Sequence, residues 1–397
     1  CSGACLYCPN DIRMPKSYLA NEPACQRAER NFFDPYLQVR ARLALLESNG
    51  HITDKIELIV LGGTWSDYDP SYQIWFISEL FRALNDGDGE AERVCAERAA
   101  FYRSCGLIAE ADTLAEQTRD LQRCVTAGAL SYNQAIARLY ASEAWVRARA
   151  RQTAAFGELE EQQRINESAH HRAVGLCVET RPELVDDASA QLMRHLGCTK
   201  VQMGIQSLDQ DILDACGRHI RVEQIVRAFS VLRLHGFKIL AHMMVNLVGS
   251  TPEHDKLDYG RLVGDPRFLP DEIKLYPCVL VESAALARLY DQGIWRPYTE
   301  DELLDVLAAD VAATPAYVRI SRMIRDISSG DIVAGNKKTN LRQMVDARTE
   351  TAESAIAEIR SREIATGDMS ACDVRLDCIS YTTAVSEERF LQWITDA

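Results

Sequence analysis

The sequence predicts an α/β protein with a partial (β/α) barrel, a helical insertion and a C-terminal α/β extension. Apolar runs rich in β-forming residues, followed by Gly, Pro or polar residues, lie at 55–61, 173–178, 200–205, 239–247 and 272–276. Helical patterns such as 191–196 and 224–234 lie between them. Continuous apolar strands separated by helices indicate a parallel sheet covered on both faces. We therefore expect site residues where the strands end, at the carboxyl rim of the barrel.

Two segments interrupt this alternation. Residues 88–169 are rich in Ala, Glu, Arg and Gln and predict several inserted helices. Their cysteines, Cys95, Cys105 and Cys124, are too widely spaced for a zinc site and are expected to be buried or half-buried thiols. Near Thr349 an Ala/Glu-rich helix is expected to lead to a run at 379–382. The sequence therefore predicts a core at 1–87 and 170–345, a helical insertion at 88–169, and a C-terminal extension at 346–397.

Composition sets limits on the class of protein. The 397 residues suffice for one large α/β domain with an appendage. No run of eighteen apolar residues occurs, so we expect no membrane span. Thirteen scattered cysteines favour a reducing, cytoplasmic compartment over a disulfide scaffold. The net charge of −14 means that any nucleic-acid contact must come from local basic segments. Because the chain begins at Cys1, we expect it to be a fragment.

The cysteines Cys1, Cys5 and Cys8 form the most informative motif. Three thiolates can hold a 4Fe-4S cluster and leave one iron open, and the expected use of that iron is to chelate S-adenosylmethionine (SAM). A zinc site is the alternative, but it needs a fourth ligand. Neither Cys25 nor His51 lies at a suitable spacing, and Cys25 is expected on a helix face.

Residues for the cofactor are expected after the first two predicted strands. Gly62 and Gly63 follow the first strand, where glycine lets the backbone approach a ligand and its carbonyls accept from an ammonium group. Glu179 and Arg181 follow the second strand and offer opposite charges to a zwitterion or to a ribose. The alternative for this charged pair is a local ion pair that contributes little.

The later strands add polar groups. Gln206 and Ser207 follow the strand at 200–205 and would suit ribose hydroxyls. Lys274 and Tyr276 alternate on one face of the last predicted strand and would point into the barrel. An inward lysine is costly unless it meets an anion, so we predict that both residues are catalytic.

Two segments are basic within this acidic chain. The first, at 319–342, includes Lys337 and Lys338 after a Gly335-Asn336 turn, and we predict phosphate contacts there, with a solvated loop as the alternative. The second, at 16–42, contains Lys16. Its basic residues alternate with aromatic ones, a combination that suits unpaired bases: Tyr18, Phe32, Phe33 and Tyr36.

Longer stretches carry a family resemblance. They read CSGACLYCPN, PKSYLANEPACQRA, NFFDPYLQV, DKIELIVLGGTW, INESAHHRAVGLCVETRPE, KVQMGIQSLDQDIL, NLVGSTPEHDKLDY, KLYPC and IRDISSGDIVAGNKKTNLRQ. In this order they resemble the Elongator catalytic subunit family, radical SAM enzymes that modify the wobble uridine of tRNA. The resemblance covers nearly the whole chain except the helical insertion.

The resemblance implies a barrel of the radical SAM type that holds a 4Fe-4S cluster and SAM, followed by an acetyltransferase-like domain. In the implied reaction, reductive cleavage of SAM yields a radical that takes hydrogen from the methyl group of acetyl-CoA. The carbon radical adds at C5 of uridine, and thioester hydrolysis leaves 5-carboxymethyl-uridine. Lys16, Lys337 and Lys338 would then contact RNA or CoA phosphates. Expected partners are the tRNA anticodon region, acetyl-CoA and an electron-donor protein, with a homodimer also considered.

Three departures from the family pattern matter. No thiol precedes the IRSRE element at 359–363, so a zinc there is not expected. The chain stops at Ala397, where the acetyltransferase domain should begin, so 346–397 is read as a linker and the start of a truncated domain. A basic N-terminal tail is also absent. Two alternatives stay open: a radical SAM enzyme with a different substrate, and a non-catalytic RNA-binding scaffold.

Overall fold

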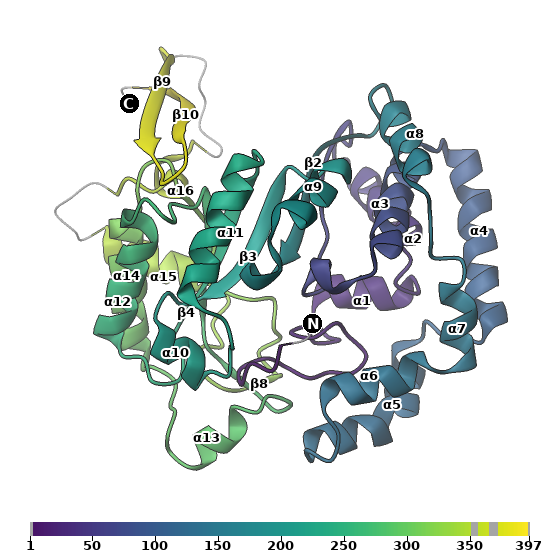
Figure 1. Cartoon of the computed structure of the whole chain (residues 1–397), viewed down its shortest axis with the longest axis horizontal. Coiled ribbons are helices and arrows are strands. Elements are labelled where there is room, and N and C mark those ends of the chain that lie inside the picture. The colour runs from purple at the N-terminus through teal and green to yellow at the C-terminus, as the bar shows by residue number, and fades with distance from the viewer. Residues whose placement is uncertain (1–2, 351–355, 365–371, 396–397) are drawn as a thin grey trace.

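A parallel sheet lies at the centre of the computed structural model, which describes residues 3–350, 356–364 and 372–395. Within these ranges six strands pair in the order β1-β2-β3-β4-β5-β7, all parallel (Figure 1). They are β1 (Lys55–Ile59), β2 (Arg172–Thr180), β3 (Lys200–Gln206), β4 (Lys238–Val245), β5 (Glu272–Pro277) and β7 (Arg319–Arg322). The partial barrel and its five predicted strands are confirmed. β7 was missed because its sequence, RISR, offers one apolar residue and resembles a basic loop.

Helices cover one face of the sheet and form the main core with it. They are α3 (Pro70–Asn85), α9 (Asp187–His195), α10 (Gln210–Ala215), α11 (Val222–Leu234), α12 (Pro252–Gly264), α14 (Glu300–Ala313) and α15 (Leu341–Thr349). In β3 the side chains of Val201, Met203 and Ile205 are buried in this core. Side chains alternate along a strand, so Gln202, Gly204 and Gln206 lie on the opposite face. That inner face is free to carry polar groups.

The predicted insertion lies between β1 and β2 and is helical. Its helices are α4 (Asp88–Cys105), α5 (Ala111–Thr126), α6 (Tyr132–Tyr140), α7 (Glu143–Arg149) and α8 (Phe156–Asn166). Asn85 of α3 donates to the Gln162 carbonyl oxygen at 2.8 Å and so ties α8 to the core. The other helices lie beside the barrel (Figure 1), where they form small apolar clusters with residues of the N-terminal segment such as Ile12, Phe32 and Leu37. Cys105 is buried and Cys95 and Cys124 are half-buried thiols, as expected.

The N-terminal basic segment folds into α1 (Pro23–Arg30) and α2 (Pro35–Ser48). Cys25 is buried on α1, as predicted. Phe32 stacks on Tyr102 with 5.3 Å between ring centroids, and Tyr36 is completely buried. The prediction that these two rings stack on unpaired bases is wrong, because packing between helices already covers them.

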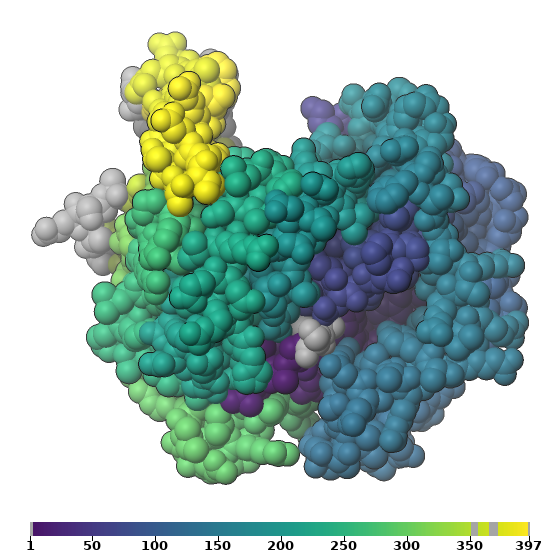
Figure 2. Space-filling model, in the orientation of Figure 1, coloured from purple at the N-terminus to yellow at the C-terminus, as the bar shows by residue number. Residues whose placement is uncertain are grey.

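The C-terminal extension contains α16 (Ile359–Arg362) and an antiparallel hairpin, β9 (Arg375–Thr382) and β10 (Glu387–Ile394). The hairpin projects from the barrel (Figure 2) and contacts it through stacked Tyr317 and Tyr381, whose centroids are 3.7 Å apart. The sequence predicts a helix that starts near Thr349. In the structure α15 ends at Thr349, and residues 356–358 are not helical. Residues 351–355 of that expected helix lie outside the described ranges.

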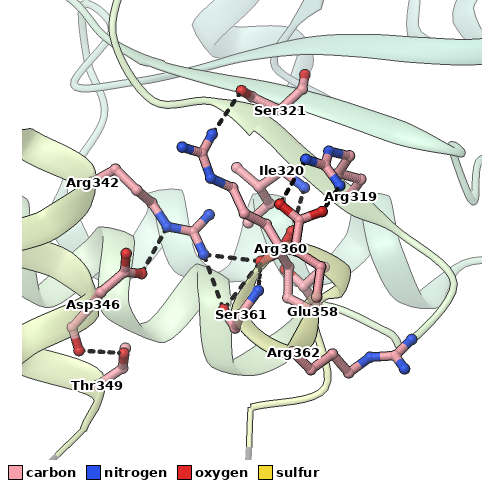
Figure 3. A network of polar contacts seen from close by, with 12 residues as sticks. Arg319, Ile320, Ser321, Arg342, Asp346, Thr349, Glu358, Arg360, Ser361 and Arg362 are labelled. Carbon is pink, nitrogen blue, oxygen red and sulfur yellow. Dashed lines mark hydrogen bonds and ion pairs between the residues drawn. The ribbon is translucent and has the colours of Figure 1, made fainter. Parts of the chain in front are cut away.

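Glu358 fastens this extension to the open edge of the sheet (Figure 3). Its carboxylate is fully buried and accepts hydrogen bonds from the Ile320 amide of β7 at 2.7 Å, the Ser361 amide at 3.1 Å and Arg342 at 2.9 Å. An unpaired strand edge would otherwise expose backbone donors. The carboxylate therefore takes the place of a strand at this position.

No helix in the described ranges is both long and apolar enough to span a membrane. Every cysteine whose position is described is a free thiol.

Replacing Glu358 with Ala should lower the free energy of unfolding by about 1–3 kcal/mol, because it leaves the Ile320 and Ser361 amides without their acceptor, while Arg342 keeps its ion pair with Asp346. Replacing Glu363, whose ion pair with Arg319 is partly exposed, should cost less than about 1 kcal/mol. Urea unfolding of both variants measures the difference. Equal losses would contradict the anchoring role of Glu358.

Candidate functional site

A cavity of about 150 Å³ opens at the carboxyl rim of the barrel. It is bordered by the N-terminal loop, the ends of the strands and the segment after β7. In Figure 2 the purple N-terminal loop lies between the barrel and the insertion. Predicted residues that line the cavity are Cys5, Cys8, Lys16, Gly63, Glu179, Arg181, Gln206, Lys274 and Tyr276. Tertiary structure thus brings most of the predicted site into one pocket.

The two described cysteines of the N-terminal motif face this pocket. Cys5 is buried and Cys8 is half-buried, and Arg218 Nη1 lies 3.8 Å from Cys5 Sγ. A hydrogen bond from Cys8, with the positive charges of Arg218 and Arg181, lowers the pKa of Cys5 to about 4 despite its burial. This environment favours a thiolate, which is the form that binds metal.

Cys1, the third predicted ligand, lies outside the described ranges. Within those ranges no group of three or more His, Cys, Asp or Glu side chains could hold a metal. The described part of the site therefore supplies two of the three predicted cluster ligands.

A row of polar side chains crosses the inner face of the sheet. Lys274 of β5 donates to Gln202 Oε1 of β3 at 2.7 Å, and His242 Nε2 of β4 lies 3.0 Å from the same oxygen. Glu179 of β2 is 3.8 Å from His242 Nδ1 and accepts from the Tyr18 hydroxyl at 2.7 Å. The sequence analysis found the two ends of this row, Glu179 and Lys274. It missed the middle, although Gln202 and His242 interrupt apolar strands at inner-face positions.

Burial moves each titratable group of this row toward its neutral form. It raises the pKa of Glu179, lowers the pKa of Lys274, and lowers the pKa of His242 well below its usual value. The floor of the pocket is therefore polar but disfavours charge. A bound group of opposite charge would relieve that cost at either end of the row.

Arg218 is a site residue that the sequence analysis missed. It is buried and donates to the Gly204 carbonyl oxygen, yet its Nε has no partner among the described residues. A buried guanidinium with an unpaired nitrogen at a pocket wall suits an anionic ligand. The sequence offered a local ion pair between Glu179 and Arg181 as the alternative to a cofactor contact. Arg181 does form a local ion pair, but with Glu183 and not with Glu179.

Two predicted cofactor residues do not face the cavity. Ser207 is buried and donates to Asp258 Oδ2 at 2.6 Å, so its role is to anchor α12 and the prediction of a ribose contact is not supported. Gly62 is not among the lining residues. Gly63 has φ +83°, and a Cβ there would lie 3.2 Å from the Lys16 carbonyl oxygen. The close approach that this glycine permits is thus to the chain's own N-terminal loop.

The lysines predicted to contact RNA or CoA occupy different environments. Lys16 is 8% exposed, and its ammonium donates to the Gly3 carbonyl oxygen, so it faces the inside of the pocket and not an RNA-accessible surface. Lys337 and Lys338 are exposed, as predicted, and border a second small cavity beside the first. Lys338 pairs with Glu300 at 2.5 Å. Among the other basic residues of 319–342, Arg319 and Arg342 are engaged in the anchoring network of Figure 3.

The chain is similar to known radical SAM proteins. The Radical SAM superfamily model matches residues 134–258, and the Radical_SAM C-terminal domain model matches residues 270–351. A tRNA uridine(34) acetyltransferase of Methanocaldococcus infernus is 33% identical over 367 residues, which cover 91% of this chain and 56% of the relative. Elongator complex protein 3 of Schizosaccharomyces pombe is 27% identical over 365 residues, covering 91% of this chain and 55% of the relative.

A solved structure extends the similarity to the fold. The archaeal Methanocaldococcus infernus Elp3 with an N-terminal deletion (1–46) superimposes with a TM-score of 0.70 at 31% identity, covering 91% of this chain and 70% of that chain. The chain belongs to the Elongator protein 3 family. As a member of this family, it spans slightly more than half the length of these two curated relatives.

The residues present fit a cluster with SAM. The thiolate favoured at Cys5 suits iron, and the Cys8 thiol, whose pKa is raised by its hydrogen bond with Cys5 and by burial, would lose its proton on binding metal. The unpaired Arg218 nitrogen suits the carboxylate of an amino-acid moiety. The Glu179 carboxylate on the opposite wall suits an ammonium group. The pocket therefore offers separate partners for the carboxylate and the ammonium group of SAM.

Neutral His242 should make stability depend on pH. The unfolded chain protonates this side chain near pH 6.5 while the folded protein keeps it neutral, so stability falls as the pH drops below that value. At pH 5.5 the loss attributable to His242 should be at most about 1.4 kcal/mol, because pH 5.5 is one unit below the usual pKa of histidine. His242→Gln should remove this component from urea unfolding curves, and His51→Gln, at an exposed position, serves as control. Identical pH profiles for wild type and His242→Gln would contradict the assignment.

Proposed function

We propose that this chain is the radical SAM core of an enzyme that forms 5-carboxymethyl-uridine at the wobble uridine of tRNA, using SAM and acetyl-CoA. The reaction belongs to the acyltransferase class. The observation that carries the proposal is a pocket in which Cys5 and Cys8 lie beside Arg218, whose Nε is unpaired within the described residues. The substrate assignment is supported by the names of the relatives, one of which is a tRNA uridine(34) acetyltransferase.

In this proposal Cys1, Cys5 and Cys8 hold a 4Fe-4S cluster, which when bound supplies the electron that cleaves SAM. Arg218 and Arg181 bind the carboxylate of the methionine moiety. Burial in a site of low polarity strengthens this charge pairing.

Two walls of the pocket complete the proposed SAM site. Glu179 takes the ammonium group, together with the backbone carbonyl at Gly63, which lines the cavity whereas Gly62 does not. Gln206 lines the pocket at the end of β3 and is proposed to face the ribose.

Lys274 and Tyr276 are proposed to contact the acyl substrate and the base. Both line the pocket, on β5. Burial raises the pKa of Tyr276, so its hydroxyl keeps its proton and can donate a hydrogen bond to a carbonyl oxygen. Burial lowers the pKa of Lys274, so this amine can exchange a proton more readily than an exposed lysine.

Phosphate contacts are proposed for Lys337 and Lys338, which are exposed next to the pocket. Lys16 lines the pocket, where it would bind a phosphate of the ligand or stabilise the loop that carries the cysteines. An electron-donor protein, a homodimer and a cytoplasmic location are further proposals. The free thiols of the described residues support a reducing compartment.

The decisive experiment measures 5′-deoxyadenosine after anaerobic reconstitution with iron and sulfide and addition of dithionite and SAM. Product should form in the wild type and fall to background in Cys5→Ala, because the variant lacks a cluster ligand. Stimulation by tRNA would support the wobble-uridine substrate, whereas product insensitive to tRNA and acetyl-CoA would favour a different substrate. Absence of product at full iron content would favour the scaffold.

Arg218→Gln should raise the Kd for SAM about 10- to 100-fold, equivalent to about 1.5–3 kcal/mol for a lost charged hydrogen bond. Gln retains an amide donor for the Gly204 carbonyl oxygen. Anaerobic calorimetry on the reconstituted protein gives the affinity. Arg221→Gln is the matched control. Arg221 is exposed and follows Arg218 closely in the sequence, so this variant should bind SAM as the wild type does. An unchanged Kd in Arg218→Gln would exclude Arg218 from the SAM site.

A further inference from the structure

The loop that follows the cysteine motif places a hydroxyl against one of the sulfurs. Ser17 Oγ lies 3.1 Å from Cys8 Sγ. Ser17 has φ +84°, a left-handed conformation that is uncommon for residues with a Cβ and costs of order 1 kcal/mol or more. A conformation of this kind persists where the surroundings hold it, and such positions concentrate at functional sites.

Arg325 supplies that restraint from a segment 308 residues away in the sequence. Its guanidinium donates to the Ser17 carbonyl oxygen, lies 3.5 Å from Glu22 Oε1, and stands 5.7 Å from the centre of the Tyr18 ring. Glu22 also accepts from the Leu19 amide at 2.9 Å. Arg325, in the segment after β7, therefore contacts Ser17, Tyr18 and Glu22 in the second part of the loop.

The direction of the Ser17 hydrogen bond follows from chemistry. A cysteine that ligates iron is a thiolate and can only accept, so the Ser17 hydroxyl must be the donor when the cluster is bound. Reduction adds negative charge to the cluster and its sulfurs. A donor on a ligand sulfur stabilises the reduced state more than the oxidised state and so raises the reduction potential.

We propose that Ser17 and Arg325 are positioning residues that set the reduction potential of the cluster at Cys8. Arg325 holds the Ser17 peptide in its left-handed conformation, and Ser17 donates to the Cys8 sulfur. Arg325 also lines the same pocket as Cys8, so its positive charge favours the reduced cluster. The inference rests on the cluster-binding part of the proposed function.

The test is a redox titration of the reconstituted full chain, followed by electron paramagnetic resonance of the reduced cluster, with iron content measured for each protein. Ser17→Ala removes the hydroxyl and keeps the strained backbone, whereas Ser17→Gly removes the hydroxyl and relieves the strain. Both should shift the midpoint potential to more negative values by similar amounts at wild-type iron content. Ser283→Ala is the control: Ser283 Oγ accepts from the Asn10 amide at 3.1 Å in the neighbouring loop. It should match the wild type.

Arg325 is tested by two variants of different charge. Arg325→Gln should shift the potential in the same negative direction as Ser17→Ala. Arg325→Lys, which keeps the charge and one donor, should shift it less. The double variant Ser17→Ala/Arg325→Gln should shift the potential by less than the sum of the two single shifts, because Arg325→Gln acts in part by weakening the Ser17–Cys8 hydrogen bond that Ser17→Ala removes.

The outcomes separate the inference from the function on which it rests. Unchanged potentials in Ser17→Ala and Ser17→Gly, with full iron content, would overturn the role of the hydroxyl. A shift in the Ser17 variants but none in Arg325→Gln would overturn the role of Arg325. A wild-type protein that binds no cluster under the same conditions would instead refute the proposed function.

Discussion

The parallel alignment of the strands is the constraint on which the rest of this molecule depends. Because β1–β5 and β7 run in one direction, all their carboxyl ends meet at one rim. Helices bury one face of the sheet, and alternation leaves the other face for polar groups. Four adjacent strands each contribute one such group, ending in Glu179 and Lys274. Burial disfavours the charged forms of Glu179 and Lys274, so a ligand group of opposite charge would stabilise them.

The N-terminal loop has little regular structure, so its position depends on partners elsewhere. The Leu6 amide donates to the Cys216 carbonyl at 3.0 Å, and the Leu6 carbonyl accepts from Leu286 at 2.8 Å. Arg218 reaches Cys5 from one side and Arg325 holds Ser17 from the other. Segments throughout the core thus contact the cysteine loop, and its conformation depends on these contacts.

The peripheral elements attach to this core through specific contacts. Through α8 the insertion packs on α3, and its remaining helices share small apolar clusters with the N-terminal segment. The C-terminal extension uses the buried Glu358 carboxylate, with two amides and Arg342 as donors. A carboxylate that pairs with backbone amides covers a sheet edge without adding a strand. The arrangement also explains why Arg319 and Arg342, which look like phosphate contacts in the sequence, have structural partners.

The sequence by itself determined the five longer strands, the helical insertion, the cysteine spacing and the family resemblance, because these depend on local patterns along the chain. It missed β7, whose four residues carry two arginines, and it assigned Ser207 to the pocket although this side chain turns toward α12. Arg218, Gln202 and His242 were also missed. Their roles follow from which sheet face is covered and from contacts between residues distant in the sequence. Only the tertiary structure decides these features, because burial and pairing are properties of the packed molecule.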